Sequence, residues 1–343
     1  MRMKYVSVGA GALFGALLLV VGFLVLSPDA TYQEADLSFE FEGTQIVGKL
    51  ILPTGTRNDP IDCMVFVHGD GAMNFDGLGY FPPYFSHFAN KNMCSFSWTK
   101  PGVEDAGGNW LDYTMADRAA LVEAGVKALR ANQTQPIKRV GLIGFSQAGW
   151  VMPKVDPAKN DVAFYVFVSP AVNWLRQSAY MSELRRADLP LDPVEQQREQ
   201  AIDALLLAGS PYAAFEELAA GDPAIEVEDF SPARWAFVAK NMRADLTSDL
   251  SNLKDVPVLL LTGGRDGQVD TGETVAAFKG ILGDKLVHQQ FGTAGHSMIE
   301  VDQRRPMQGL DGFWLLLKVA FQGRDAFANG FWAAMDEFIA AAK

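Results

Sequence analysis

Short apolar runs alternate with segments of helical periodicity along most of the chain. Runs rich in Val, Leu, Ile and Phe predict buried strands, and they occupy residues 61–69, 93–98, 137–145, 161–170, 256–264 and 286–291. Apolar residues at helical spacing predict helices, and these occupy residues 82–92, 115–132, 147–155 and 330–342. Strands that alternate with helices form βαβ units. The pattern therefore predicts an α/β fold with a mostly parallel sheet and helices on both faces.

The segment before these runs has a different pattern. Residues 37–53 alternate apolar and polar positions on both sides of Glu42 and Gly43. Alternation of period two is typical of half-buried strands, and a glycine between two such strands favours a tight turn. The segment therefore predicts a β-hairpin.

The alternation stops in the middle of the chain. Residues 170–251 show helical periodicity and many charges but no strand pattern. We expect a helical lid inserted between the first part of the core, residues 31–169, and the second part, residues 252–343. The lid should cover the carboxyl end of the sheet and supply most side chains of the substrate pocket.

Residues 1–30 differ from everything that follows. Arg2 and Lys4 precede a stretch, residues 5–26, that contains no charged residue. About 20 apolar residues are enough to cross a bilayer as a helix, and a basic flank favours an inside N-terminus. We expect a signal anchor with a single transmembrane helix in the bacterial inner membrane and an exported, periplasmic globular part. The alternative is a cleaved signal peptide and a secreted protein.

Composition narrows the classes of function. The 343 residues are 49% hydrophobic, which is enough for one large core with an insertion. The 29 Lys and Arg stand against 41 Asp and Glu, for a net charge of −12, so nucleic acid is not expected as a partner. The two cysteines and four histidines lack the spacing of metal ligands, so no metal site is expected.

The two cysteines raise a separate question. Cys63 and Cys94 lie in two predicted strands that should be neighbours in the sheet, at a similar height. An exported protein folds in an oxidising compartment, which permits a disulfide bond. Free cysteine is also a common small core residue, and both states are compatible with the sequence.

The end of the predicted strand at 137–145 carries the first sign of chemistry. It runs into Gly144-Phe145-Ser146-Gln147-Ala148-Gly149. This is close to the G-x-S-x-G nucleophile elbow, in which a serine occupies a sharp turn between a strand and a helix. Small neighbours are needed because the turn is tight. Ser146 is therefore predicted to be a nucleophile, the alternative being a plain turn.

A serine hydroxyl needs a histidine base and a carboxylate that orients it, in the chain order Ser, acid, His. Only His288 and His296 follow the serine. His296 lies in a loop past the end of a strand, where such sites gather, and it is the expected base. Asp266 and Asp270 follow the strand at 256–264. Asp266 is nearer the strand end, whereas Asp270 has the pattern of a helix N-cap, so Asp266 is the expected acid.

Acyl transfer also needs two hydrogen-bond donors for the developing oxyanion. The backbone N–H of Gln147, directly after the serine, is one expected donor. The loop "HGDGAMN" after the strand at 61–69 is expected to supply the other through the backbone N–H of Asp70. His68 is expected to be a buried structural residue.

Taken in order, several motifs resemble those of the α/β-hydrolase superfamily, and most of all its lidded esterase, thioesterase and serine-peptidase-like group. The motifs are "GKLILP", "HGDG", "TKPGV", "GFSQAG", "PVLLLTGGRD" and "AGH". The resemblance implies the α/β-hydrolase fold from about Leu37 to the C-terminus. The site residues it implies are the triad Ser146, Asp266 and His296 and the oxyanion donors Asp70 and Gln147.

Two positions depart from that family pattern. Asp70 stands where a small neutral residue is common, and a carboxylate aimed at an oxyanion would oppose it, so its side chain must point away. The stretch 99–110 keeps Lys100 and Gly102 but loses the rest of the usual loop, and its acidic residues and Trp110 are candidates for the mouth of the site.

The sequence thus predicts a membrane-anchored, exported serine hydrolase that acts on an ester, thioester or amide. Its substrate is a small molecule or an acyl compound, and no cofactor is needed. One alternative is a serine peptidase or acyltransferase that uses the same triad. Another is an α/β-hydrolase-like protein that binds an acyl or hydrophobic ligand without catalysis.

Overall fold

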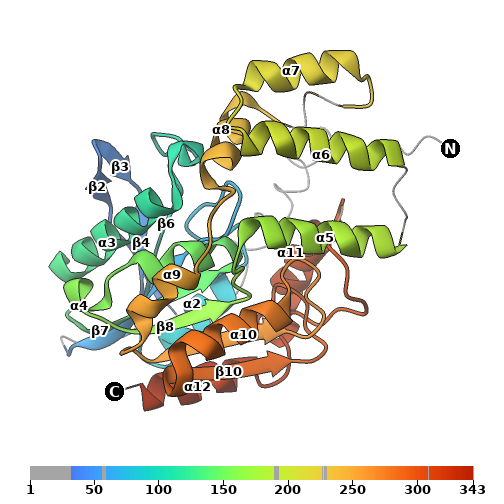
Figure 1. The fold of residues 1–343 in the computed structure, drawn as a ribbon. Helices are drawn as coiled ribbons and strands as arrows, with labels where there is room; N and C mark the ends of the chain where they lie inside the picture. The colour runs from blue at the N-terminus through green and yellow to red at the C-terminus, as the bar shows by residue number, and fades with distance from the viewer. Residues whose placement is uncertain are drawn as a thin grey trace.

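A computed structural model describes residues 32–55, 59–188, 193–225, 227, 230–307 and 309–342. Its centre is an eight-stranded sheet in the order β1-β4-β6-β5-β7-β8-β9-β10 (Figure 1). The strands are β1 Tyr32–Asp36, β4 Gly48–Pro53, β5 Ile61–Val67, β6 Cys94–Trp98, β7 Ile137–Phe145, β8 Val162–Val168, β9 Val258–Gly263 and β10 Leu286–Phe291. From β6 to β10 all neighbours are parallel, while β1 and β4 pair antiparallel. The predicted mostly parallel sheet is confirmed.

Helices cover both faces of the sheet, as predicted. The core helices are α2 Pro82–Asn90, α3 Met115–Ala131, α4 Pro157–Asn160, α10 Thr271–Leu282, α11 Asp311–Gln322 and α12 Phe331–Ala341. Alternate residues of the central strands point to opposite faces: Val65 and Leu142 pack with α3 and α10, whereas Phe66 and Ile143 pack with α2 and α12. Each strand is thus buried on both sides, which explains the continuous apolar runs in the sequence.

The predicted hairpin is present but smaller than expected. It comprises β2 Phe39–Phe41 and β3 Thr44–Ile46, which form a separate two-stranded sheet. Glu42 and Gly43 both have positive φ, at 49° and 76°, as a tight hairpin turn requires. The last part of the predicted segment is β4, which joins the large sheet instead.

The helix expected at residues 147–155 is wrong. The chain there forms two short 3₁₀ turns, Ser146–Trp150 and Met152–Lys154. Two residues explain the difference. Pro153 has no N–H to donate within a helix. Gly149 is pressed against the next segment, since a Cβ on it would lie 2.8 Å from Cβ of Pro170.

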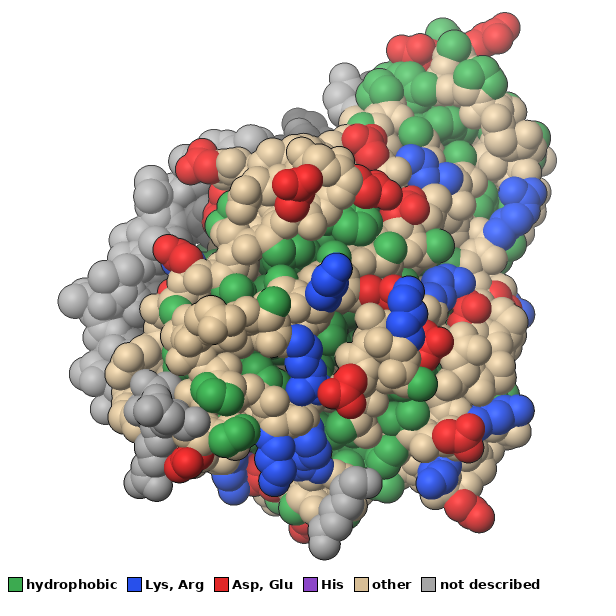
Figure 2. Space-filling view, turned by 90° about the vertical axis from the view of Figure 1, so that its left-hand side faces the viewer, with side chains coloured by type: hydrophobic (Ala, Val, Ile, Leu, Met, Phe, Trp, Pro, Cys, Tyr) green, Lys and Arg blue, Asp and Glu red, His purple; other side chains and the backbone are tan. Residues whose placement is uncertain are grey.

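The described part of the segment between β8 and β9 consists mainly of helices joined by loops. It contains α5 Trp174–Asp188, α6 Pro193–Leu207, α7 Tyr212–Gly221, α8 Pro232–Asn241 and α9 Thr247–Leu250. In Figure 1, α6, α7 and α8 lie in the upper part of the molecule and α5 lies below α6, nearer the core, whereas α9 returns to the core and packs beside α10. In the side view, this lid rises above the rest of the molecule and carries hydrophobic and acidic side chains at its upper end (Figure 2).

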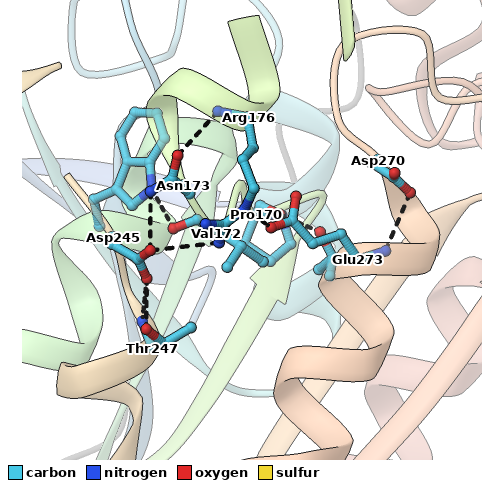
Figure 3. Close-up of polar contacts among 10 residues, drawn as sticks. Pro170, Val172, Asn173, Arg176, Asp245, Thr247, Asp270 and Glu273 are labelled. Carbon is cyan, nitrogen blue, oxygen red and sulfur yellow. Dashed lines mark hydrogen bonds and ion pairs between the residues drawn. The ribbon is translucent and has the colours of Figure 1, made fainter. Parts of the chain in front are cut away.

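The two ends of the lid are joined where it leaves the core. Asn173, just before α5, pairs with Asp245 in an isolated β-bridge and donates from Nδ2 to its carboxylate at 2.9 Å. Arg176 in the first turn of α5 reaches both Asp245 and Glu273 of α10, as Figure 3 shows. The base of the lid is therefore anchored by polar contacts to the core.

Cys63 and Cys94 face each other in the β5–β6 register, with their Cα atoms 4.4 Å apart, and are joined in a disulfide bond. Of the two states compatible with the sequence, the structure shows the bonded one.

The transmembrane helix expected at residues 5–26 lies outside the described residues. Among the residues that are described, no helix is long and apolar enough to cross a membrane.

Candidate active site

The register of the parallel strands brings their carboxyl ends to one edge. Val67 pairs with Gly144, Phe145 with Val168, and Gly263 with Phe291. The loops that follow β5, β7, β9 and β10 therefore leave the sheet side by side. These are the loops that carry the predicted site residues.

Ser146 occupies a strained turn directly after β7. Its φ is +50°, a conformation that costs a non-glycine residue about 1–3 kcal/mol and is concentrated at functional sites. The neighbours must be small, because a Cβ on Gly144 would lie 2.7 Å from Cβ of Ala148 and closer still to the sulfur of Met152. The hydroxyl-bearing residue is half-buried, so it remains accessible at the edge of the sheet.

His296 is paired with a buried carboxylate. Its Nδ1 lies 2.9 Å from Oδ2 of Asp266, whose residue is only 1% exposed. The other oxygen of Asp266 accepts from the backbone N–H groups of Gln268 at 2.8 Å and Val269 at 3.0 Å. With both oxygens engaged, the carboxylate is fixed, and it fixes the orientation of the imidazole in turn.

Close backbone packing keeps this pair together. A Cβ on Gly263, the last residue of β9, would lie 2.4 Å from the carbonyl oxygen of Gly295. A Cβ on Gly264 would lie 2.6 Å from the carbonyl oxygen of Gly292. Only glycines allow the loops after β9 and β10 to approach so closely. Asp266 lies two residues after Gly264, and His296 directly follows Gly295, so these contacts hold the two residues near each other.

The other two candidates have different roles. Asp270 caps α10, accepting from the backbone N–H of Glu273 at 3.1 Å (Figure 3). His288 lies on β10, where its Nε2 is 3.0 Å from Oγ1 of Thr262. The structure thus brings His296 to Asp266 rather than to Asp270.

Ser146 and His296 both line one cavity of about 320 Å³. Its remaining wall is almost wholly apolar and includes Phe145, Val168 and, from α11, Leu315 and Leu316. A second cavity of about 550 Å³ also reaches Ser146, from the side of the lid. The lid lines it with polar as well as apolar side chains, among them Gln177, Ser178, Glu199, Arg234, Leu206 and Val238.

The loop after β5 lies against the elbow. A Cβ on Gly69 would be 3.2 Å from the carbonyl oxygen of Phe145 and 3.6 Å from Cβ of Ser146. Lys100, which is 4% exposed, donates from Nζ to the carbonyl oxygens of Gly69 and Gly71, both at 2.7 Å. In a trans peptide the N–H points opposite to the C=O. By holding the Gly69 carbonyl, Lys100 also sets the direction of the Asp70 N–H.

Gln147 is held by a second buried cation. The guanidinium of Arg118, on α3, donates to Oε1 of Gln147 and, at 2.6 Å, to the carbonyl oxygen of His68. Arg118 thereby connects the elbow with the loop after β5. Burial lowers the pKa of Arg118 to about 10 and that of Lys100 well below its usual value. Burial is also the main reason why the pKa of His68 falls to about 3, which keeps this imidazole neutral.

The side chain of Asp70 turns to the lid. Its two oxygens accept from both terminal nitrogens of Arg234, on α8, at 3.0 and 2.7 Å. Burial by itself would raise the pKa of Asp70, but the hydrogen bonds and charge of Arg234 outweigh that effect and lower it. The carboxylate therefore remains ionised beside Ser146, paired with a lid residue.

The roles of Arg118, Arg234 and Lys100 were not predicted from the sequence. Arg118 carried a detectable signal, because it lies at helical spacing from Met115 and Val122 on the apolar face of its helix. A cation on a buried face needs a buried acceptor. Arg234 gave no comparable signal, since its partner is 164 residues away. Among the described residues, no group of His, Cys, Asp and Glu could hold a metal ion.

Comparison with solved structures supports the same fold. The esterase Pf2001 of Pyrococcus furiosus is 15% identical over 91% of each chain, with a TM-score of 0.56. Est1E of Butyrivibrio proteoclasticus, solved with ferulic acid bound, is 16% identical over 88% of this chain and 99% of its own, with a TM-score of 0.52. The alpha/beta hydrolase GrgF of Penicillium sp. sh18 is 16% identical over 77% of this chain and 91% of its own, with a TM-score of 0.53.

At these identities the likeness shows a shared fold. A search of curated protein sequences found no relative. The family comparison is more specific, because residues 64–307 match the alpha/beta hydrolase family. That range contains the elbow, the lid and the loops after β9 and β10. The chain therefore belongs to the alpha/beta hydrolase family.

Proposed function

We propose that the protein is a serine hydrolase that cleaves an ester, thioester or amide bond through an acyl-enzyme on Ser146. The observation that carries the proposal is the pairing of His296 with the buried Asp266 in a cavity that Ser146 shares. A serine, a histidine and a carboxylate that act together perform nucleophilic acyl transfer on several unrelated folds, in different chain orders.

In the proposed first step, His296 takes the proton of the Ser146 hydroxyl through Nε2 while Oγ bonds to the substrate carbonyl carbon. The carbonyl oxygen becomes an oxyanion that accepts from the backbone N–H groups of Asp70 and Gln147. The carboxylate of Asp266 holds the imidazole by Nδ1 and stabilises the imidazolium that forms. The bond to the leaving group then breaks, and His296 returns the proton to that group.

In the proposed second step, water replaces the leaving group. His296 takes a proton from the water, whose oxygen attacks the acyl carbon of the ester on Ser146. The second tetrahedral intermediate collapses with release of the carboxylic acid, and the serine hydroxyl regains its proton from His296. Every proton moves between Ser146, His296 and the reactants, so the reaction needs no cofactor.

The two cavities indicate the polarity of the substrate. The cavity beside α11 is apolar and suits a hydrocarbon part, while the lid cavity offers amide, hydroxyl and charged groups. We therefore place the apolar part of the substrate beside Leu315 and Leu316 and the polar part under the lid. Esterases among the similar structures make esters the first compounds to test.

The test is a hydrolysis screen of the full chain with p-nitrophenyl esters of graded acyl length, acyl-thioesters and aryl amides, each repeated with Ser146→Ala. Preferred cleavage of thioesters or amides would move the substrate class to a thioesterase or peptidase. Transfer of the acyl group to an added alcohol in place of water would indicate an acyltransferase. Failure of a fluorophosphonate to modify Ser146, together with no turnover, would leave a ligand-binding protein and overturn the proposal.

The location of the protein stays a prediction from residues 1–30. We propose that this segment anchors the protein in the inner membrane with the hydrolase exported. The full chain should then stay in the membrane fraction after carbonate extraction. A soluble processed form that begins near Thr31 would instead show a cleaved signal peptide.

A further inference from the structure

Asp70 presents an electrostatic problem at the proposed oxyanion site. Its backbone N–H is one of the two proposed donors, and its own side chain is an anion. The preceding Gly69 is so near the nucleophile that a Cβ on it would lie 3.6 Å from Cβ of Ser146. A carboxylate this close to a developing oxyanion destabilises the transition state unless its charge is compensated.

Among the described residues, only Arg234 of the lid donates to this carboxylate from both terminal nitrogens of a guanidinium. Arg234 donates to the two oxygens of Asp70 at 3.0 and 2.7 Å, a two-pronged geometry that is strong and directional. The side chains of Arg234 and Asp70 are 32% and 41% exposed, so solvent screens the pair in part, and the two-pronged geometry is what holds the carboxylate in one direction. The pair is thus a compensated ion pair at the boundary between the two cavities and the lid.

Arg234 is itself held in place by its surroundings. Its guanidinium lies over the ring of Phe237, 5.1 Å from the centroid, and 5.9 Å from that of Trp110. Its backbone N–H donates at 3.1 Å to Oγ of Ser231, the N-cap of α8. Trp110 also faces Lys100, whose Nζ is 4.7 Å from the ring centroid. Arg234 therefore packs against Trp110, and Trp110 in turn contacts Lys100, the residue that holds the loop after β5.

We propose that Arg234 is a positioning residue of the oxyanion site: it draws the Asp70 carboxylate toward the lid and neutralises it, so that the Asp70 N–H can serve the oxyanion. The inference rests on the proposed function. It explains how a carboxylate is tolerated at this position, and it makes full activity depend on the docked position of α8. If the pair only held the lid in place, Asp70→Asn would not restore the rate that Arg234→Gln loses, whereas compensation of the Asp70 charge predicts that it does.

The experiment is a double-mutant cycle on the full chain with p-nitrophenyl butyrate as the probe. Arg234→Gln should lower kcat about tenfold, less than the 10²–10³ typical for loss of a whole oxyanion donor. In the Asp70→Asn background, where the backbone N–H remains but the charge is gone, the same change should cost less than about threefold. Arg234→Lys, which keeps the charge, should retain most of the rate.

A matched control separates this effect from loosening of the lid. Arg198 of α6 forms an ion pair with Asp222 at 2.5 Å, wholly within the lid. Arg198→Gln removes a comparable Arg–Asp pair and should change kcat by less than about twofold. Thermal melting of each variant shows whether it remains folded.

The outcomes are distinct from those that test the proposed function. An equal loss from Arg234→Gln with and without the Asp70 charge, or no loss at all, overturns the inference while Ser146 is still labelled. Activity that survives Ser146→Ala overturns the proposed function instead. If the ester is turned over too slowly to measure, the rate of fluorophosphonate labelling of Ser146 supplies the same cycle, because that reaction also builds negative charge on an oxygen at this site.

Discussion

The core side and the lid side of the site are built in different ways. On the core side, Asp266, Lys100 and Arg118 are 1%, 4% and 7% exposed and lie at or beside the ends of buried strands. On the lid side, the Arg234 side chain is 32% exposed, and the described part of α6 has a single buried residue, Leu206. The proposed chemistry thus rests on closely packed parts, and the proposed recognition of the substrate on loosely packed helices.

The difference has a physical reason. Proton transfer and oxyanion stabilisation fail when groups shift by about 1 Å, and only dense packing with satisfied hydrogen bonds holds side chains that precisely. A pocket wall tolerates larger shifts, because hydrophobic contacts are not directional. We therefore expect changes on the core side to lower the rate, and changes in the walls or on the lid side, apart from Arg234, to alter selectivity.

The largest effect is expected at the base. His296→Ala should lower kcat/KM by about 10⁶, because the serine loses its only proton acceptor. His288→Ala is the matched control, since that imidazole contacts Thr262 on the sheet. Steady-state hydrolysis of p-nitrophenyl butyrate measures both. Similar losses from the two variants would contradict the assignment of His296.

The acid gives the next largest effect. Asp266→Asn should lower kcat by about 10⁴, since an amide favours the wrong imidazole tautomer. Asp270→Asn should leave kcat within about twofold, because asparagine is an equally good N-cap for α10. Kinetics of the two variants decide between the aspartates. A larger loss from Asp270→Asn would reverse the assignment.

Lys100, whose buried amine holds the loop after β5, should contribute less to kcat than the triad residues do. Lys100→Met removes the donor to the Gly69 and Gly71 carbonyls and frees the Asp70 N–H to turn away. We expect kcat to fall by about 10², with KM changed much less, because the donor acts in the transition state. Lys91→Met, at a surface ion pair with Asp336, is the control. A loss confined to KM would argue against a positioning role.

The smallest effect concerns selectivity for acyl length, and it tests which of the two cavities holds the acyl chain. Gly312 of α11 lines the apolar cavity, and a Cβ there would meet no atom within 4 Å, so Gly312→Leu fills space without a backbone clash. It should lower kcat/KM for decanoate relative to butyrate esters by about tenfold, since a few methylenes lose their pocket. Gly280→Leu on α10, equally free of contacts, is the control.

The opposite selectivity result is equally informative. Leu206 lines the lid cavity, and Leu206→Trp fills that side instead. A chain-length shift from Leu206→Trp with none from Gly312→Leu would place the apolar part of the substrate under the lid. That result would reverse the proposed orientation of the substrate without affecting the proposed chemistry.

Patterns local in the sequence predicted much of this architecture. Continuous apolar runs located the central strands, because a strand buried on both faces must be apolar at every position. The β1 strand Tyr32–Asp36 was missed, since it lies at the edge with mostly exposed side chains and has no such run. Helix α11 was missed too, although its apolar residues recur at helical spacing; two of its large apolar residues, Trp314 and Phe321, are exposed.

For the candidate site as well, residues marked by a local sequence pattern could be predicted, and residues brought in by tertiary packing could not. Ser146, Asp266 and His296 each follow a predicted strand, so the order of strands was enough to nominate them. Arg234 comes from a helix 164 residues away in the chain and contacts Asp70 only through the tertiary packing of the lid. Contacts between segments far apart in the chain depend on tertiary packing, which periodicity does not encode.

The most direct test of the central claim is covalent labelling of the serine. The full chain is treated with a fluorophosphonate probe, and the modified peptide is located by mass spectrometry. A Ser146–His296–Asp266 triad predicts one adduct, on Ser146, that forms quickly in the native protein, is absent in Ser146→Ala and is strongly slowed in His296→Ala. Labelling at another serine, or labelling of Ser146 at the same rate without His296, would contradict it.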